Sequence, residues 1–200
     1  MAQRIRRLAL PALSRLALRP APETTLRAGI IICAALALLL AITTRSLAGS
    51  PNDAQRIVGR TAPQRTLPAV QDGHLLPQPI ALAGHPGHPT LLIFTYSLCP
   101  HCLGETQAIQ QLQQRYTTRG LYVTYIDSPA EATSIVSAYQ QRLNVADPML
   151  LDAGGTVADR FGIHYYPAIV LIDAHGVVRH VETGETSLQT LQHDIEEIVR

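Results

Sequence analysis

The stretch "YSLCPHCLGE", Tyr96 to Glu105, places two cysteines three residues apart at the junction of two predicted elements. The run before it, "TLLIFTY" at 90–96, is short, apolar and rich in β-formers, which is typical of a buried strand. From Pro100 to about residue 116, apolar residues recur at helical spacing. Cys99 therefore follows a buried strand and immediately precedes a helix, with proline at the favoured first helical position.

This position favours redox chemistry over the other uses of a cysteine pair. A sulfur at a helix N-terminus meets unpaired N–H groups and the positive end of the helix dipole, and both favour the thiolate form of Cys99. Cys102 lies one turn into the helix, where we expect a shielded, resolving thiol. A structural disulfide here would close too short a loop to constrain the unfolded chain. An all-cysteine zinc site needs four cysteines, and the third cysteine, Cys33, lies in an apolar run as a small hydrophobic residue.

The histidines leave a copper-binding site as an alternative to a redox site. A positive charge on His101, between the cysteines, would favour the thiolate further and make the pair a stronger oxidant. Soft thiolates also select Cu(I), so both cysteines and a histidine could form a copper site. The candidate ligands are His85 and His88, in "GHPGHP", and His164. We expect redox chemistry, with no metal and no organic cofactor.

The rest of the C-terminal part predicts an α/β domain with a central mixed sheet. Residues 50–89 are rich in Pro and Gly and are expected to form a linker and then an irregular lead-in with short edge strands. Strands and helices then alternate. The predicted elements after the first helix are a strand at 121–127, a helix at 131–142, a strand at 148–152, a helix at 157–161, a strand at 168–173, a hairpin around His175-Gly176 and a last helix capped by Ser187.

Charge is unevenly divided along the chain. Residues 1–50 contain seven Arg and one Glu, which is 7 − 1 = +6, whereas residues 51–200 contain nine Arg and fourteen acidic residues, which is 9 − 14 = −5. The acidic C-terminal part argues against nucleic acid as a partner, because phosphate binding needs a basic face.

An apolar run at 28–44 predicts a membrane segment. Its seventeen uncharged residues would span about 26 Å as a helix, within the lower range for crossing a bilayer. Six arginines precede it, which predicts a cytoplasmic N-terminus and delivery of the remainder across the membrane. "SLA", Ser46 to Ala48, has the pattern of a signal-peptidase site, so cleavage after Ala48 is the alternative to an anchor. We favour the anchor because the basic head is long for a signal peptide.

The predicted organisation therefore has four parts. They are a basic cytoplasmic segment at 1–27, a transmembrane anchor at 28–44, a linker at 45–56 and a folded domain at 57–200. The folded domain would face an oxidising compartment that permits disulfides.

From about residue 57 to 200, the chain resembles the membrane-tethered, thioredoxin-fold TlpA/ResA-like proteins. The resemblance is carried by the terminal helix and by three stretches: "VGRTAPQRTLPAV", "FTYSLCPHCLGE" and "MLLDAGGTVADRFGIHYYPAIVLIDAHGVV". It implies a thioredoxin-like fold and thiol–disulfide exchange with proteins in the bacterial periplasm. It also implies tethering to the inner membrane and a membrane thiol-redox partner as electron source or sink.

The resemblance assigns roles to individual residues. Cys99 and Cys102 match the redox pair of the family. Glu105 matches a carboxylate that lies near the cysteines and assists proton transfer. Pro167 matches a cis-proline that faces the cysteines, and the backbone of Tyr166 would pair with an extended segment of substrate.

The chain departs from the family at two places, and the second concerns the direction of electron flow. Leu98 stands where the family usually has Trp, and Pro100-His101 is the dipeptide of the DsbA-type periplasmic oxidants. DsbA-type proteins carry a helical insertion, whereas here only the predicted helix at 131–142 separates the second and third core strands. We predict a TlpA-like reductase. A DsbA-like oxidant and a Cu(I)-binding assembly factor are the alternatives.

Overall fold

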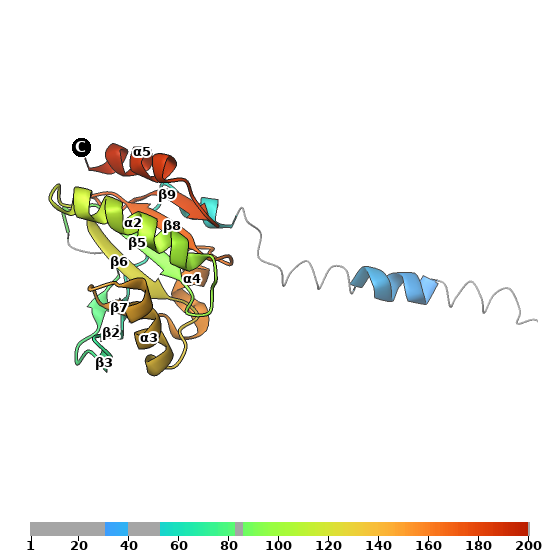
Figure 1. Cartoon of the computed structure of the whole chain (residues 1–200). Coiled ribbons are helices and arrows are strands. Elements are labelled where there is room, and N and C mark those ends of the chain that lie inside the picture. The colour runs from blue at the N-terminus through green and yellow to red at the C-terminus, as the bar shows by residue number, and fades with distance from the viewer. Residues whose placement is uncertain (1–30, 40–52, 83–85, 200) are drawn as a thin grey trace, which may run out of the picture. The chain divides into compact units, whose positions relative to one another are not determined.

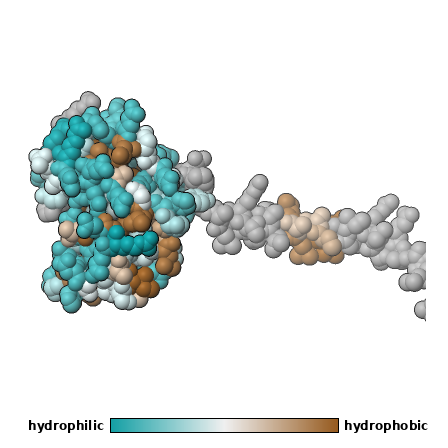
Figure 2. Space-filling model, viewed as in Figure 1, coloured by the Kyte–Doolittle hydropathy of each residue, from teal (hydrophilic) through white to brown (hydrophobic). Residues whose placement is uncertain are grey.

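A computed structural model describes residues 31–39, 53–82 and 86–199 (Figure 1). The chain divides into two compact units, Met1–Ala48 and Gly49–Arg200. The described residues of the first unit, 31–39, form an exposed helix that Figure 2 colours as hydrophobic. Within the three described ranges, no helix combines the length and the apolar character needed to cross a membrane.

Several predictions fall wholly or partly outside the described residues. These are the basic segment 1–27, both ends of the predicted anchor, the cleavage site at Ser46–Ala48, most of the linker, and His85.

The second unit is built on a seven-stranded mixed sheet in the order β3-β2-β7-β6-β5-β8-β9. Its strands are β2 (Ala69–Gln71), β3 (His74–Leu75), β5 (Thr90–Thr95), β6 (Tyr122–Asp127), β7 (Met149–Leu151), β8 (Ala168–Ile172) and β9 (Val178–Thr183). β5 lies between β6, to which it is parallel, and β8, to which it is antiparallel. A separate two-stranded sheet pairs β1 (Thr66–Leu67) with β4 (Ile80–Ala81). The predicted α/β domain with a mixed sheet and short edge strands is confirmed.

Apolar side chains cover both faces of the sheet. One cluster joins the sheet to α2 (Cys102–Thr117), α3 (Thr133–Leu143) and α5 (Leu188–Ile198). The other cluster lies with α4 (Thr156–Arg160) and the short 3-10 helix η1 (Ala54–Ile57). Along β5, Leu91 and Ile93 belong to the first cluster, and Leu92 and Phe94 belong to the second. The strand reads as a continuous apolar run because it is buried on both faces.

The predicted elements are present, with shifted ends. Helix α2 begins at Cys102 rather than Pro100, because residues 97–101 first make a turn in which the Cys99 N–H donates to the Tyr96 carbonyl at 2.9 Å. Shifts of one or two residues are usual at helix ends. At α5 the predicted cap is confirmed, since the Ser187 hydroxyl accepts a hydrogen bond from the Thr190 N–H at 3.1 Å.

The packed domain begins before residue 57. Ala54, in η1, is only 1% exposed and belongs to the apolar core. Gly162, which follows α4, has a φ of +69° and packs so closely on Asp53 that a Cβ there would lie 2.5 Å from the Asp53 carbonyl carbon. The predicted linker, 45–56, therefore ends inside the folded domain.

Replacing Gly162 by alanine should weaken this packing. Gly176 is the matched control, because its φ is +77° and a Cβ there would meet nothing within 4 Å. Gly176→Ala should cost about 1–2 kcal/mol through its left-handed backbone alone. Gly162→Ala should cost more, because η1 must also move. Urea unfolding of the two variants measures the difference, and equal losses would contradict the close contact.

Candidate redox site

The two cysteines form a disulfide where β5 leads into α2. Cys99 is half-buried, whereas Cys102 is fully buried. The backbone N–H of Cys102, at the first residue of α2, donates a hydrogen bond to Cys99 Sγ at 3.1 Å. The outer sulfur therefore lies on the positive N-terminal end of α2, where a thiolate is stabilised once the disulfide is reduced.

The dipeptide between the cysteines is exposed to solvent. Pro100 and His101 complete the turn that leads into α2. His101 Nδ1 lies 3.0 Å from Oε1 of Glu185, a residue of the segment between β9 and α5. The histidine therefore has a carboxylate partner that is 84 residues away in the sequence.

Glu105 is a buried carboxyl group one turn after Cys102, on the same face of α2. Its side chain is only 8% exposed. Oε1 accepts a hydrogen bond from the Thr186 N–H at 3.0 Å, while Oε2 has no partner. Burial raises the pKa of Glu105 to about 7, the Thr186 hydrogen bond opposes that rise, and the negative charge of Glu185 adds to it. Such a carboxyl group can take up and return a proton near neutral pH.

The Tyr166-Pro167 peptide bond is cis, as the family resemblance predicted. It leads into β8, whose first residue, Ala168, pairs with Phe94 near the end of β5. Because β5 continues into the cysteine turn, Pro167 and Cys99 lie at the same end of the sheet. The Tyr166 hydroxyl donates to Ser128 Oγ at 3.2 Å, which ties this loop to the end of β6.

Two buried aspartates behind the site were not singled out from the sequence. Asp127 is fully buried at the end of β6, where its Oδ2 accepts a hydrogen bond from Ser97 Oγ at 2.7 Å and its Oδ1 has no partner. Burial raises the pKa of Asp127. Asp152, also fully buried, accepts from Ser128 Oγ at 2.8 Å and from the Ala158 N–H at 2.9 Å.

A sequence signal for these aspartates exists. Asp127 is the last residue of the predicted strand "LYVTYID", and Asp152 is the last residue of the predicted strand "PMLLD". The two strands are parallel neighbours, so their carboxyl ends meet at one edge of the sheet. Within the described residues, the buried side-chain N or O atoms that lack a hydrogen-bond partner are Glu105 Oε2 and Asp127 Oδ1. Both are carboxylate oxygens. Glu105 is three residues from Cys102 in the sequence, and Asp127 is hydrogen-bonded to Ser97 in the cysteine turn.

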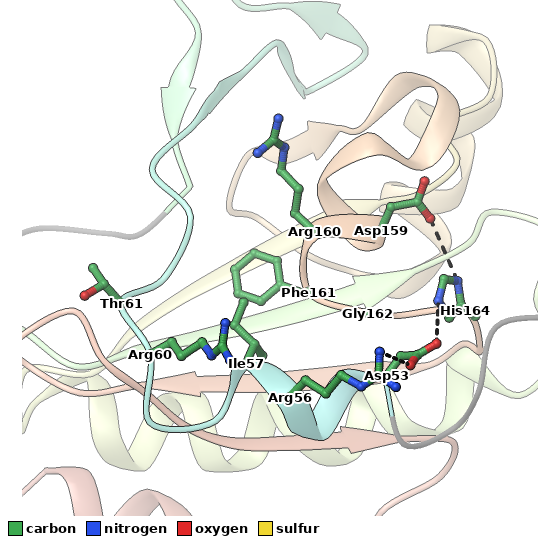
Figure 3. A pocket seen from close by; sticks show the side chains of 10 residues that line it. All are labelled: Asp53, Arg56, Ile57, Arg60, Thr61, Asp159, Arg160, Phe161, Gly162 and His164. Atoms are coloured by element: carbon green, nitrogen blue, oxygen red, sulfur yellow. Dashed lines mark ion pairs between the residues drawn. The ribbon is translucent and has the colours of Figure 1, made fainter.

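The two candidate copper-binding histidines that the structure describes, His88 and His164, have partners other than the cysteines. His88, which precedes β5, packs edge-on against Tyr122, the first residue of β6. This contact lies at the opposite end of β5 from the cysteines. His164 lines a cavity of about 400 Å³, where its ring nitrogens lie 3.9 Å from Asp53 and 3.8 Å from Asp159 (Figure 3). In the part of the chain that the structure describes, no group of three His, Cys, Asp or Glu residues is placed to hold a metal ion.

Comparison with known proteins gives a consistent result. Residues 57–198 match the Redoxin family. The chain is 27% identical over 110 residues to the thiol-disulfide oxidoreductase ResA of Halalkalibacterium halodurans, a match that covers 55% of this chain and 62% of the relative, less than two thirds of its length. It is 24% identical over 169 residues to the thiol:disulfide interchange protein DsbE of Allochromatium vinosum, which covers 82% of this chain and 90% of the relative.

A solved structure shares the fold. It is described as a thiol:disulfide interchange protein DsbE from Chlorobium tepidum, with a TM-score of 0.64 and 21% identity over 72% of this chain and 98% of that one. The fold of the described residues 53–82 and 86–199 is therefore thioredoxin-like, as predicted.

The raised pKa of Glu105 predicts that the oxidised protein loses stability as pH rises. Folding favours the protonated carboxyl, so this stabilisation is complete below the ordinary pKa of 4.5 and is lost as pH rises through about 7. The loss should be on the order of 3 kcal/mol. Urea unfolding between pH 4 and 8 should show this fall in the free energy of unfolding. In Glu105→Gln the fall over the same pH range should be smaller by the same amount.

The matched control is Glu182→Gln, which removes a carboxylate from β9. It should leave the wild-type slope in place. A Glu105→Gln protein that keeps the wild-type profile would show that Glu105 titrates normally.

Proposed function

Because this chain belongs to the Redoxin family, we propose that it is a thiol–disulfide oxidoreductase that exchanges disulfides with partner proteins through Cys99 and Cys102. One observation carries the proposal: Cys99, a half-buried residue whose sulfur lies on the N-terminus of α2, is bonded to the fully buried Cys102. The sulfur of Cys99 can attack a partner or be attacked by one. The sulfur of Cys102 is shielded from solvent.

The proposed reaction has two exchange steps. In the reducing direction, the Cys99 thiolate attacks one sulfur of a partner disulfide, so that a mixed disulfide forms and the other partner sulfur leaves as a thiolate. Cys102 then loses its proton and attacks Cys99 Sγ, which forms the Cys99–Cys102 disulfide and releases the second partner sulfur. The partner gains two electrons and two protons, one of them from Cys102 and the other from solvent. The oxidising direction is the same path reversed.

Glu105 is the proposed proton carrier for the inner cysteine. It lies one turn after Cys102 on α2, and its pKa of about 7 lets it accept a proton from a thiol and return it near neutral pH. Its Oε2, buried without a partner, is the oxygen available for that proton.

The partner polypeptide is proposed to lie along Tyr166 and Pro167. An extended segment there would add a strand beside the cis-proline loop and present its sulfur to Cys99. Two apolar side chains near the site are exposed, Leu98 at 63% and Tyr165 at 51%, and offer contact area to such a segment.

A tethered, periplasmic location is part of the proposal. The support is the uncharged run at 28–44 with six preceding arginines, and the exposure of the apolar side chains of the described helix at 31–39. The protein would then be a single-pass protein of the bacterial inner membrane that exchanges electrons with a membrane thiol-redox partner. Intact mass of protein purified from membranes tests this, because loss of residues 1–48 would show a cleaved signal instead.

The alternative is a Cu(I)-binding assembly factor that uses the same cysteines and a histidine. Neither His88 nor His164 is oriented toward the cysteines, so oxidoreductase activity is the better-supported function. Reconstitution under reducing conditions separates the two. Stoichiometric Cu(I) that is lost when both cysteines are changed to Ser would favour the assembly factor.

The roles of the two cysteines predict different defects in their serine variants. Cys99→Ser should abolish exchange, because the attacking sulfur is lost. Cys102→Ser should still attack but accumulate a mixed disulfide, because nothing resolves it. Turnover of a model protein disulfide and non-reducing gels measure both effects. A Cys99→Ser protein that retains activity, or mixed disulfides formed only by Cys102, would overturn the assignment.

The reduction potential of the pair tests the proposed direction. We propose a reductase, because the scaffold lacks the helical insertion of the DsbA-type oxidants: α3 alone connects β6 to β7. The potential should therefore lie near the ~ −270 mV of thioredoxin, measured by equilibration with glutathione. A value near the ~ −120 mV of DsbA would instead identify an oxidant, the direction that Pro100-His101 favours by itself.

A further inference from the structure

One loop contacts three parts of the redox site. It comprises residues 184–187 between β9 and α5, and we call it the Glu185 loop. The Glu185 carboxylate lies 3.0 Å from His101 Nδ1, and the Thr186 N–H donates to Glu105 Oε1 at 3.0 Å. The loop therefore contacts both His101, one of the two residues between the cysteines, and the buried carboxyl group of Glu105.

The loop is also held at both of its ends. The Gly184 N–H donates to the carbonyl of Pro167 at 2.8 Å, which joins the loop to the cis-proline segment. At the other end, the Ser187 side chain caps α5 by accepting from the Thr190 N–H. With its backbone fixed on both sides, Glu185 is placed beside His101 even though its side chain is 65% exposed.

We propose that Glu185 is a positioning residue that makes the Cys99–Cys102 pair less oxidising than Cys-Pro-His-Cys would be alone, by countering the charge of His101. This inference rests on the proposed thiol–disulfide exchange. It concerns the direction of that exchange, on which the dipeptide and the scaffold disagree.

The physical reason lies in the charge of the reduced site. Reduction converts a neutral disulfide into a pair that contains the Cys99 thiolate, so any group that stabilises the thiolate makes the pair more oxidising. A His101 imidazolium does so. A carboxylate 3.0 Å from that imidazole cancels much of its field at Cys99 and itself repels the thiolate.

The two contacts of the loop act together on the reduced site. The ionisable groups in contact with this loop are His101, which lies beside Glu185, and Glu105, which accepts from the Thr186 N–H. The charge of Glu185 also contributes to the raised pKa of Glu105. The charge of Glu185 thus disfavours negative charge at both the thiolate and Glu105, whereas the Thr186 N–H of the same loop favours it at Glu105.

The stability of the fold should barely depend on Glu185. The His101–Glu185 pair is 70% and 65% exposed, and such surface pairs contribute little to folding. Glu185→Gln should therefore fold normally, so that a change in redox behaviour can be assigned to the charge.

The experiment compares four full-length proteins: wild type, Glu185→Gln, His101→Gln and the double variant. Each is equilibrated with glutathione at the same mildly acidic pH. The Cys99 thiolate is titrated in parallel by its ultraviolet absorbance. Glu182→Gln, three residues earlier on β9, is the matched control for loss of one carboxylate.

Glu185→Gln should shift the equilibrium about threefold toward a stronger oxidant, which is roughly 14 mV at ~30 mV per tenfold change. It should also lower the apparent pKa at which the Cys99 thiolate forms. Both shifts should shrink markedly when His101 is already Gln, because Glu185 acts through that residue.

Three results would overturn the inference: no shift in Glu185→Gln, an equal shift in Glu182→Gln, or a full shift in the absence of His101. Failure of the proposed function would look different. In that case the wild-type protein itself would not exchange disulfides with glutathione or a protein substrate.

Discussion

Burial of β5 on both faces is the constraint on which the site depends. All six residues from Thr90 to Thr95 are buried, and alternate side chains enter the two apolar clusters of the domain. A strand held on both faces, and between β6 and β8, has little freedom to shift its register. The cysteine turn that follows β5 therefore has a fixed position at the carboxyl end of this central strand. Because β5 ends at Thr95, the turn that follows places Cys99 Sγ on the N-terminus of α2.

Three buried carboxyl groups lie in or behind the site, Glu105, Asp127 and Asp152, and each costs free energy unless it is paired or protonated. Glu105 and Asp127 are each left with one oxygen without a partner, and burial raises the pKa of both. Asp152, in contrast, is fully used as a hydrogen-bond acceptor at the start of α4. Asp152 thus stabilises the fold, whereas the two groups with free oxygens are suited to hold a proton near the reacting sulfurs.

Local patterns were enough to predict much of the domain. The apolar run at 90–96, the helical spacing after Pro100 and the Ser187 cap each indicated an element that the structure contains. The cis bond before Pro167 was predicted only through the family resemblance, because local residues favour trans. The start of the domain was placed too late, since nothing in the sequence of η1 shows that Ala54 packs under Gly162.

The sequence by itself determined the strand, the two cysteines after it and the helix that begins there, because these depend on neighbours a few residues apart. Only the tertiary structure decided what surrounds them. Glu185 and Thr186 reach His101 and Glu105 across 84 and 81 residues, and Ser128 links Tyr166 to Asp152. Such contacts exist only after the sheet has brought β9, β6 and α2 together. The type of a residue does not indicate which residue so far along the chain will be its contact partner.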